Sequence, residues 1–324
     1  MLLEVDNLSV RFASDEGPVQ AVDGVSFSVE PGEVVGIVGE SGCGKSATAM
    51  SIPRLLSSPP ATVNANHIRF NGADLLSMPI GELRKLRGKA ISVIFQEPMT
   101  ALSPLQRIGN QLVEIVRLHE TVSKKEAWAR GEDWLNKVGI PDAAERMHAW
   151  PHELSGGMRQ RVMIAMALIL SPQLIIADEP TTALDVTIQA QVFQLMLDLK
   201  AGDTSILLIT HDMGVIWELC QRVIVMYASR IVESGPVDAI FAKPRHPYTQ
   251  GLLAATPSLR EKGQRLPAIP GQVPSPRAYP PGCHFAERCA YSDDACLASK
   301  PALEMRTPQH AVACFHDENL TPSV

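Results

Sequence analysis

Apolar and polar residues alternate along two stretches near the start of the chain, residues 1–12 and 19–29. A period of two is typical of strands that are buried on one face only. The segment between them, residues 14–18, is rich in residues that favour turns. We therefore expect two antiparallel strands, so that the chain begins as a β-rich unit.

Continuous apolar runs without alternation occur further along, at residues 34–38, 174–177 and 205–209. Such runs are typical of parallel strands that are covered on both faces. A helical pattern over residues 187–200 separates the last two runs, which produces strand–helix–strand order. The core is thus predicted to be an α/β sheet.

The intervening chain has a mainly helical pattern of mixed charge, from about residue 105 to 138 and again from about 155 to 170. Pro141 and Pro151 interrupt this pattern. We expect a helical subdomain at about residues 98–172, inserted in the α/β core.

The composition of the chain changes after about residue 240. Nine prolines lie between residues 244 and 281, which disfavours long regular elements there. Four of the six cysteines follow, between residues 283 and 314. We therefore predict a core domain at residues 1–245 and a small Pro/Cys-rich C-terminal domain at residues 246–324.

The chain has 324 residues, 45% of them apolar, which is enough for a large core. Its 29 basic and 35 acidic residues give a formal net charge of −6, so it lacks the overall basic character of a nucleic-acid binder. Its longest apolar runs, such as residues 162–170, are far shorter than the ~20 residues that cross a bilayer, and no leader-like segment opens it. We expect a protein that is neither secreted nor membrane-spanning by itself.

A glycine-rich octapeptide, Gly39–Ser46, follows the apolar run at residues 34–38 and precedes a helical run. It matches G-x4-G-K-[ST], the phosphate-binding loop. Glycines let backbone N–H groups converge on phosphate oxygens, while Lys45 reaches the β- and γ-phosphates and the Ser46 hydroxyl can ligate Mg²⁺. The candidate nucleotide contacts here are Gly39, Ser41, Gly42, Cys43, Gly44, Lys45, Ser46 and Ala47.

Two carboxylates, Asp178 and Glu179, follow the apolar run at residues 174–177. In a phosphate-loop protein, Asp178 can hold the Mg²⁺ shell and Glu179 can polarise the attacking water. On local grounds alone, an acidic pair at a strand end is more often a helix N-cap. Its place after a phosphate loop favours hydrolysis of the bound nucleotide.

A serine and two glycines, Ser155, Gly156 and Gly157, open the helical run at residues 155–170. They predict a second helix N-terminus that can bind an anion. Alternatively, Ser155 is an ordinary N-cap and the glycines form a loop. Together with the phosphate loop and the strand-end carboxylates, this segment resembles the nucleotide-binding domain of the ATP-binding cassette (ABC) superfamily, a P-loop NTPase fold.

Further residues occur in the order that is usual in this superfamily. The resemblance implies that Phe12 stacks on adenine, although tyrosine is more usual there and the alternative is an ordinary strand residue. It implies that Gln96 touches Mg²⁺ and the transmembrane partner, against the alternative of a solvated strand-end glutamine. It also places Asp185 in a loop that communicates across a dimer and His211 at the γ-phosphate, although a lone histidine is more often structural.

The same resemblance implies a head-to-tail dimer with ATP and Mg²⁺ as cofactors. The phosphate loop of one chain and Ser155–Gly157 of the other would enclose one ATP, so hydrolysis would depend on closure of the dimer. Because the key residues of both halves are present, this chain can contribute competent halves to both composite sites.

Four segments narrow the resemblance: residues 97–104, 154–161, 187–191 and 245–249. They look like those of the ATP-binding subunits of dipeptide/oligopeptide and nickel importers, over residues 3 to about 316. This implies an ATPase that powers uptake of dipeptides or oligopeptides. The alternatives are the same machine with nickel, a metallophore or another small solute as cargo, and a soluble ABC ATPase without a transport role.

The resemblance to this branch of the superfamily, the peptide and nickel importers, also implies partners and a location. The partners would be two transmembrane permease subunits, a second ATP-binding subunit that is more often a different chain than a second copy, and indirectly an extracellular or periplasmic substrate-binding protein. The location would be the cytoplasmic face of the inner membrane, with peripheral attachment and no nucleic-acid partner.

Four cysteines follow the Pro-rich stretch: Cys283, Cys289, Cys296 and Cys314. Four thiolates suit a [4Fe–4S] cluster or a tetrahedral zinc ion. The wide gaps lack the close pairs of the usual zinc sites, and the resemblance to this branch also favours the cluster; zinc and unliganded thiols are the alternatives. The other two cysteines, Cys43 and Cys220, are expected to fill space.

Overall fold

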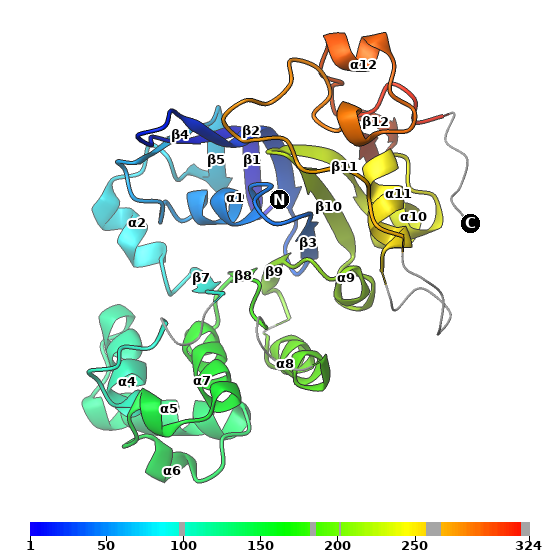
Figure 1. The fold of residues 1–324 in the computed structure, drawn as a ribbon. Coiled ribbons are helices and arrows are strands. Elements are labelled where there is room, and N and C mark those ends of the chain that lie inside the picture. Colours follow the sequence, from blue (N-terminus) through cyan, green and yellow to red (C-terminus); the bar gives the residue numbers. More distant parts are fainter. Residues whose placement is uncertain (97–100, 182–185, 201, 257–266, 319–324) are drawn as a thin grey trace. The chain divides into compact units, whose positions relative to one another are not determined.

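A computed structural model describes residues 1–96, 101–181, 186–200, 202–256 and 267–318 (Figure 1). The chain forms two compact units. The first unit consists of Met1–Ser77 and Leu208–Val324, and the second unit consists of Met78–Leu207.

The first unit contains an antiparallel sheet built on the N-terminal strands. β1 (Leu3–Phe12) pairs with β2 (Val19–Val29), which confirms the predicted antiparallel pair. Three short strands that the sequence pattern does not reveal complete this sheet: β4 (Ala61–Asn64), β5 (His67–Phe70) and β6 (Ala73–Asp74). β4 and β5 pair with β1, and β6 pairs with β5.

The second sheet of this unit leads into the phosphate loop. Its strand order is β12-β13-β11-β10-β3-β9, and only the last two residues of β9 belong to this unit. The strands are β3 (Val34–Val38), β9 (Ser205–Ile209), β10 (Arg222–Tyr227), β11 (Arg230–Pro236), β12 (Glu304–Thr307) and β13 (His310–Val312). β3 runs parallel to β10 and is buried at every position, as its continuous apolar run predicts.

The helices of the first unit are short. They are α1 (Lys45–Ser51), α9 (Met213–Leu219), α10 (Val237–Ala242), α11 (Pro247–Ala254), the 3-10 helix η3 (Ala286–Arg288) and α12 (Asp294–Ala298). α9 packs directly on β3, because a Cβ atom on Gly36 would lie only 2.3 Å from Cδ1 of Ile216. The described part of the Pro-rich C-terminal region has only short elements, as expected.

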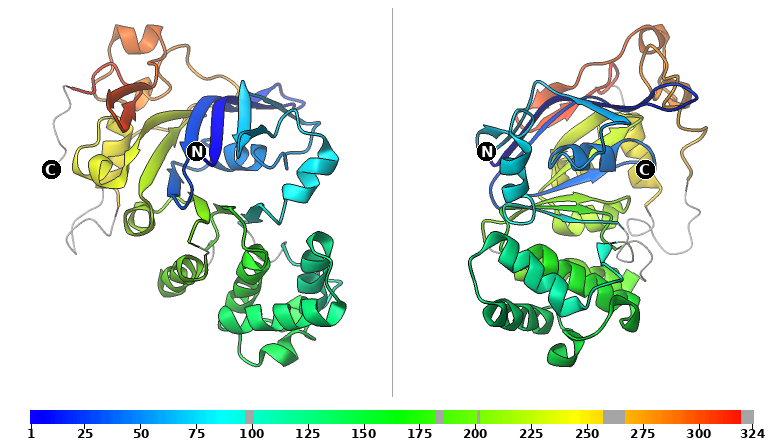
Figure 2. Two further views of the ribbon diagram at one scale, coloured as in Figure 1. Left: turned by 180° about the vertical axis from the view of Figure 1, so that it is seen from behind. Right: turned by 90° about the vertical axis from the view of Figure 1, so that its left-hand side faces the viewer.

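The second unit contains a parallel strand pair and a group of helices. Its elements are α2 (Ile80–Leu86), β7 (Ile91–Ile94), α4 (Ile108–His119), α5 (Lys124–Lys137), α6 (Ala143–Arg146), the 3-10 helix η1 (Pro151–Glu153), α7 (Gly156–Leu168), β8 (Leu174–Asp178) and α8 (Val186–Leu199). β7 and β8 run parallel, with Ile94 opposite Ala177. α4, α5 and α7 lie side by side (Figure 2).

The helical pattern over residues 105–138 corresponds to two helices rather than one. α4 ends at His119, and Ser123 begins α5 with a capping box. The Ser123 hydroxyl accepts the Glu126 N–H at 3.2 Å, while the Glu126 carboxylate accepts the Ser123 N–H at 2.8 Å. Reciprocal bonds of this kind satisfy two N–H groups that a helix start leaves free, so the chain begins a new helix here.

The boundary that the sequence places at residue 245 stays a prediction, as does the extent of the helical subdomain. Among the residues that the structure describes, no helix has the length and apolar character needed to cross a bilayer.

Candidate functional site

The phosphate loop lies between β3 and α1, both in the first unit. Two of its glycines are required by sterics. A Cβ atom on Gly39 would lie 2.1 Å from the carbonyl oxygen of Met226, and one on Gly44 would lie 2.2 Å from that of Ala21. Gly44 also has a φ of 104°, a conformation that other residues adopt only with strain. The loop therefore fits closely against the backbone of β10 at Gly39 and of β2 at Gly44.

The lysine of the loop is held by the loop itself. Nζ of Lys45 donates to the carbonyl oxygens of Gly39 at 2.8 Å and Glu40 at 3.0 Å, and its side chain is buried. Sγ of Cys43 lies 3.8 Å from the same nitrogen. Burial raises the pKa of the Cys43 thiol, so it stays neutral and fills space as expected.

Other predicted nucleotide contacts of this unit lie on α1 and at the end of β1. Ser46 and Ala47 stand in the first turn of α1, where Ser46 is exposed. Phe12 is half-buried at the end of β1, opposite Val19 of β2. The steric demand for glycine, the lysine and the exposed hydroxyl fit a nucleotide phosphate with its Mg²⁺.

His211 belongs to the first unit as well. It follows Thr210, whose N–H donates to the carbonyl oxygen of Ile37 in β3 at 3.2 Å. Asp212 then caps α9, since its Oδ1 accepts the N–H of Gly214 at 2.7 Å. The histidine is therefore fixed between a strand beside β3 and a capped helix.

The second unit brings together Gln96, Asp178 and Glu179. Because β7 and β8 pair in parallel, their carboxyl ends meet, and Nε2 of Gln96 donates to Oε2 of Glu179 at 3.0 Å. Asp178 is the buried last residue of β8. Glu179 has a φ of 43°, in the left-handed region that non-glycine residues rarely occupy. Such strain of order 1–2 kcal/mol is typical of functional positions.

Ser155 is the N-cap of α7, as the local alternative predicts. Its Oγ accepts the N–H of Met158 at 3.3 Å. A Cβ atom on Gly156 or Gly157 would meet nothing within 4 Å, so packing within this chain does not require either glycine. Nε2 of Gln160, in the first turns of α7, donates to the carbonyl oxygen of Pro180, which ties this helix to the segment after Glu179.

The structure thus places the predicted residues in two groups. Phe12, the phosphate loop and His211 lie in the first unit, and Gln96, Asp178, Glu179 and Ser155–Gly157 lie in the second. Asp185 lies outside the described residues. So do residues 97–100, which belong to one of the segments that resemble those of peptide and nickel importers. The catalytic and binding roles of all these residues stay predictions.

The four C-terminal cysteines line one cavity of the first unit. Cys283, Cys289, Cys296 and Cys314 line it together with Phe285 and His316. Sγ of Cys289 accepts the N–H of Tyr291, and Sγ of Cys314 accepts that of His316, both at 3.4 Å. Four residues spread over 32 positions of sequence therefore converge as the cysteine spacing suggests.

The surroundings of these thiols disfavour their ionised form. Burial raises the pKa of all four, and that of Cys314 to about 12. Neutral thiols are expected where no metal is bound, whereas a bound metal would hold them as thiolates.

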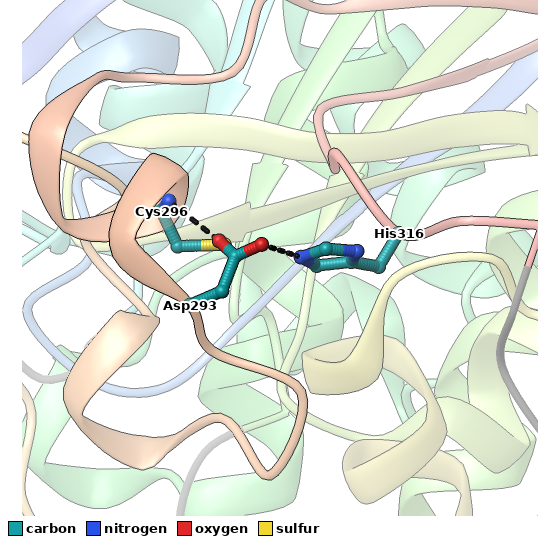
Figure 3. Close-up of side chains that lie close together, drawn as sticks. All are labelled: Asp293, Cys296 and His316. Carbon is teal, nitrogen blue, oxygen red and sulfur yellow. Dashed lines mark hydrogen bonds and ion pairs between the residues drawn. The ribbon is translucent and has the colours of Figure 1, made fainter.

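Two further side chains of types that can bind a metal, Asp293 and His316, lie close to Cys296, and the sequence reasoning missed both. The ligand atoms of Asp293, Cys296 and His316 lie within 4.8 Å of one another (Figure 3). Oδ2 of Asp293 is 3.1 Å from Nε2 of His316, and Oδ1 accepts the N–H of Cys296 at 3.0 Å. The available signal was spacing, because Asp293 precedes Cys296 by three residues and His316 follows Cys314 by two.

Cys220 is buried against β3, as expected. A Cβ atom on Gly36 would lie 3.1 Å from its sulfur. Burial raises the pKa of Cys220 to about 12, which is consistent with a space-filling role in the core.

Two family models match the chain. The model described as ABC transporter matches residues 22–182, and the model described as oligopeptide/dipeptide transporter, C-terminal region, matches residues 232–296.

Relatives and solved structures agree with these matches. The chain is 50% identical to a probable peptide ABC transporter ATP-binding protein, y4tR, of Sinorhizobium fredii, over 99% of this chain and 96% of the relative. It is 48% identical to the dipeptide transport ATP-binding protein DppD of Escherichia coli and 49% identical to the oligopeptide transport ATP-binding protein AppD of Bacillus subtilis, each over 97% of this chain and 96% of the relative.

Among solved structures, the ATP-binding cassette MJ0796 bound to ADP and Pi superposes with a TM-score of 0.65 at 25% identity, covering 73% of this chain and 99% of that one. CbiO1 of Clostridium perfringens gives a TM-score of 0.60 at 26% identity, covering 74% of this chain and 90% of that one. These likenesses confirm the predicted ABC nucleotide-binding fold and the predicted family. The chain belongs to the ABC transporter family, among the ATP-binding proteins of peptide transporters.

Proposed function

We propose that this chain is the ATP-hydrolysing subunit of a membrane importer that takes up dipeptides or oligopeptides. The observation that carries the proposal is the combination, in one chain, of a complete phosphate loop and the C-terminal region of oligopeptide/dipeptide transporters. Near full-length identity to named dipeptide and oligopeptide transport proteins supports peptides over nickel or another small solute. It also supports a transport role over a soluble ATPase of another kind.

The residues divide the work of hydrolysis. The backbone of the phosphate loop and Lys45 bind the phosphates, and Ser46, Gln96 and Asp178 supply oxygen ligands of the kind that Mg²⁺ prefers. Held by these residues, Mg²⁺ would neutralise charge that develops on the phosphates. Glu179 is the acceptor that orients the attacking water, with its carboxylate held by Gln96 at 3.0 Å. His211 contacts the γ-phosphate, and Phe12 stacks on adenine.

The complete site forms between two ATP-binding subunits. Ser155, Gly156 and Gly157 of one subunit cover the nucleotide bound by the other, and Asp185 takes part in communication across the dimer. The open space around both glycines supports this role, because a partner or a phosphate can approach the backbone there. We favour a different second ATP-binding subunit over a second copy.

The same proposal gives the protein its place in the cell. Two transmembrane permease subunits anchor it at the cytoplasmic face of the inner membrane, and a substrate-binding protein acts through them. The formal net charge of −6 supports the absence of a nucleic-acid partner.

We further propose that Cys283, Cys289, Cys296 and Cys314 hold a [4Fe–4S] cluster. Their convergence on one cavity supports this, as do the backbone N–H groups that point at two of the sulfurs. Zinc is the competing metal, since Asp293 and His316 could complete a mixed site with Cys296.

Anaerobic purification distinguishes these possibilities. A cluster predicts iron and acid-labile sulfide in equal amounts, both lost in Cys289→Ser and both kept in the control Cys220→Ala. Zinc without sulfide, lost in His316→Ala, would favour the mixed site, and the absence of both metals would contradict each proposal.

Transport is tested on the complex purified from native membranes. We expect two permease subunits and a second ATP-binding protein to copurify, and proteoliposomes to take up labelled dipeptide in an ATP-dependent way. Glu179→Gln should bind ATP but abolish hydrolysis and uptake. Uptake of ⁶³Ni²⁺ without peptide uptake would overturn the cargo, and a chain without membrane companions would overturn the importer.

A further inference from the structure

One residue of the phosphate loop, Glu40, is held from the C-terminal region of the chain. Its carboxylate accepts two hydrogen bonds from the guanidinium of Arg288, from Nη1 to Oε2 at 2.9 Å and from Nη2 to Oε1 at 3.1 Å. Its backbone N–H donates to the hydroxyl oxygen of Tyr248 at 2.8 Å. Its carbonyl oxygen accepts Nζ of Lys45 at 3.0 Å. Glu40 therefore links two C-terminal side chains to the lysine of the phosphate loop.

All five N–H groups of the Arg288 guanidinium donate hydrogen bonds, which fixes the side chain. Besides the two bonds to Glu40, Nη1 donates to the Tyr227 hydroxyl at 3.2 Å, Nη2 to the carbonyl oxygen of Ile269 at 3.3 Å, and Nε to that of Pro270 at 2.8 Å. Its side chain is only 6% exposed. Burial opposes the charge, but the hydrogen bonds to Glu40 and Tyr227 outweigh it and raise the pKa of Arg288.

Tyr248 is held in a cluster of three buried aromatic rings. Tyr227, Tyr248 and Phe285 contact one another with ring centroids 4.6, 5.1 and 5.5 Å apart. Arg288 lies over two of these rings, with Cζ 5.6 Å from the centroid of Tyr227 and 5.8 Å from that of Phe285. Mainly because of burial, the pKa of Tyr248 is raised, so its hydroxyl stays neutral and keeps accepting the N–H of Glu40.

Without a neutralising partner, the negative charge of Glu40 would oppose the binding of phosphate to the loop. The loop collects N–H groups and a lysine around an anion, and a carboxylate within it repels that anion. A bidentate guanidinium neutralises the carboxylate and turns it away from solvent. Removing the guanidinium would leave a half-buried negative charge, only 28% exposed, within the loop that binds phosphate.

We propose that Arg288 and Tyr248 are positioning residues of the ATP site, which fix and neutralise Glu40 so that the phosphate loop and Lys45 are arranged for the nucleotide. The C-terminal region is then part of the nucleotide site of its own chain. This inference depends on ATP binding at the phosphate loop, and it is independent of the cargo and of the permease.

The test measures ATP affinity of the full chain with Mg²⁺ by calorimetry, together with kcat and KM of the assembled complex. Arg288→Met should raise the Kd and KM for ATP at least about tenfold, the factor that one charge-assisted hydrogen bond contributes, with a smaller change in kcat. Arg277→Met is the matched control, because Arg277 is another C-terminal arginine paired with an N-terminal glutamate, Glu16, outside the phosphate loop.

A double-mutant cycle separates positioning from general damage. In a Glu40→Gln background, which removes the repelling charge, Arg288→Met should change the Kd less than about threefold, because coupled residues are non-additive. Arg288→Lys should restore part of the affinity by keeping the charge.

Three results would overturn the proposal. They are an unchanged Kd in Arg288→Met, the same loss in the wild-type and Glu40→Gln backgrounds, and an equal loss in the Arg277 control. If Arg288→Met alone does not fold, the comparison of Arg288→Lys in the two backgrounds gives the same decision. Wild-type chain that binds no ATP would instead contradict the nucleotide site itself.

Discussion

The buried carboxylate of Glu233 offers a sharp test of how the C-terminal region is attached. Glu233 lies in β11 and is 0% exposed. Oε1 accepts the Arg245 N–H at 2.6 Å and lies 2.7 Å from Nε2 of His310, while Oε2 accepts the His246 N–H at 3.0 Å. One side chain thus joins β11 to the start of α11 and to β13.

Glu233→Gln keeps the volume but replaces one acceptor oxygen with an NH₂ group. At least one of the two backbone N–H groups, of Arg245 or His246, then faces another donor inside the protein. An unsatisfied buried N–H costs about 1–3 kcal/mol. The remaining bonds also lose their charge assistance. We expect the free energy of unfolding to fall by about 2–4 kcal/mol, which corresponds to a fall of roughly 4–10 °C in Tm.

Thermal unfolding followed by circular dichroism measures this effect. The control is Glu304→Gln, because the Glu304 side chain is 58% exposed in its pair with Arg306 and should contribute under about 1 kcal/mol. Equal Tm values for the two variants would refute the argument that Glu233 holds these segments together.

Three further predictions concern other parts of the chain. Gly44→Ala should abolish ATP binding in calorimetry without unfolding the protein, because the new Cβ would lie 2.2 Å from the Ala21 carbonyl oxygen at a φ of 104°; wild-type affinity would contradict the loop geometry. Burial raises the pKa of Cys220 from 9.0 to about 12, so the stability that its neutral thiol provides is present below pH 9 and lost as pH rises towards 12. In urea unfolding, the free energy of unfolding of the wild type should fall by about 1 kcal/mol per pH unit over this window relative to that of Cys220→Ala. Parallel pH profiles of the two proteins would exclude this contribution of Cys220. Ser123→Ala removes the cap of α5 and should cost about 1 kcal/mol in urea unfolding, whereas an unchanged midpoint would show that the cap is dispensable.

The parts of the fold that local pattern determines were predictable. The alternation in β1 and β2, the apolar runs of β3, β8 and β9, and the phosphate loop are each encoded within a dozen neighbouring residues. The same holds for Ser155, whose hydroxyl caps the helix that it begins. Local sterics and periodicity suffice in these cases.

Interactions between distant segments were not predictable in this way. β12 and β13 are too short for a clear period, and β13 pairs with β11, a partner more than 70 residues earlier in the chain. Glutamate is a residue type that is mostly exposed, yet Glu233 is buried by partners from two later segments. The Glu40–Arg288 pair spans 248 residues, and no local spacing reports it.

The cysteine cluster is an intermediate case. The sequence analysis predicted a shared site for the four cysteines, and all four residues line one cavity. Asp293 and His316 escaped notice because each is a common surface residue, and only the fold brings them beside Cys296.

The 248-residue separation of Glu40 and Arg288 also matters during synthesis on the ribosome. At ~5–20 residues per second, Arg288 is made roughly 12–50 seconds after the phosphate loop. Until then the carboxylate of Glu40 lacks its guanidinium partner, and the edge of β11 stays unpaired until residues 310–312 of β13 are also made. Such an edge can pair with other chains, so nascent copies on one polysome are vulnerable to aggregation until the last segment is released. A chain that ends upstream of Arg288 would therefore lack both the guanidinium that neutralises Glu40 and the strand that pairs with the edge of β11.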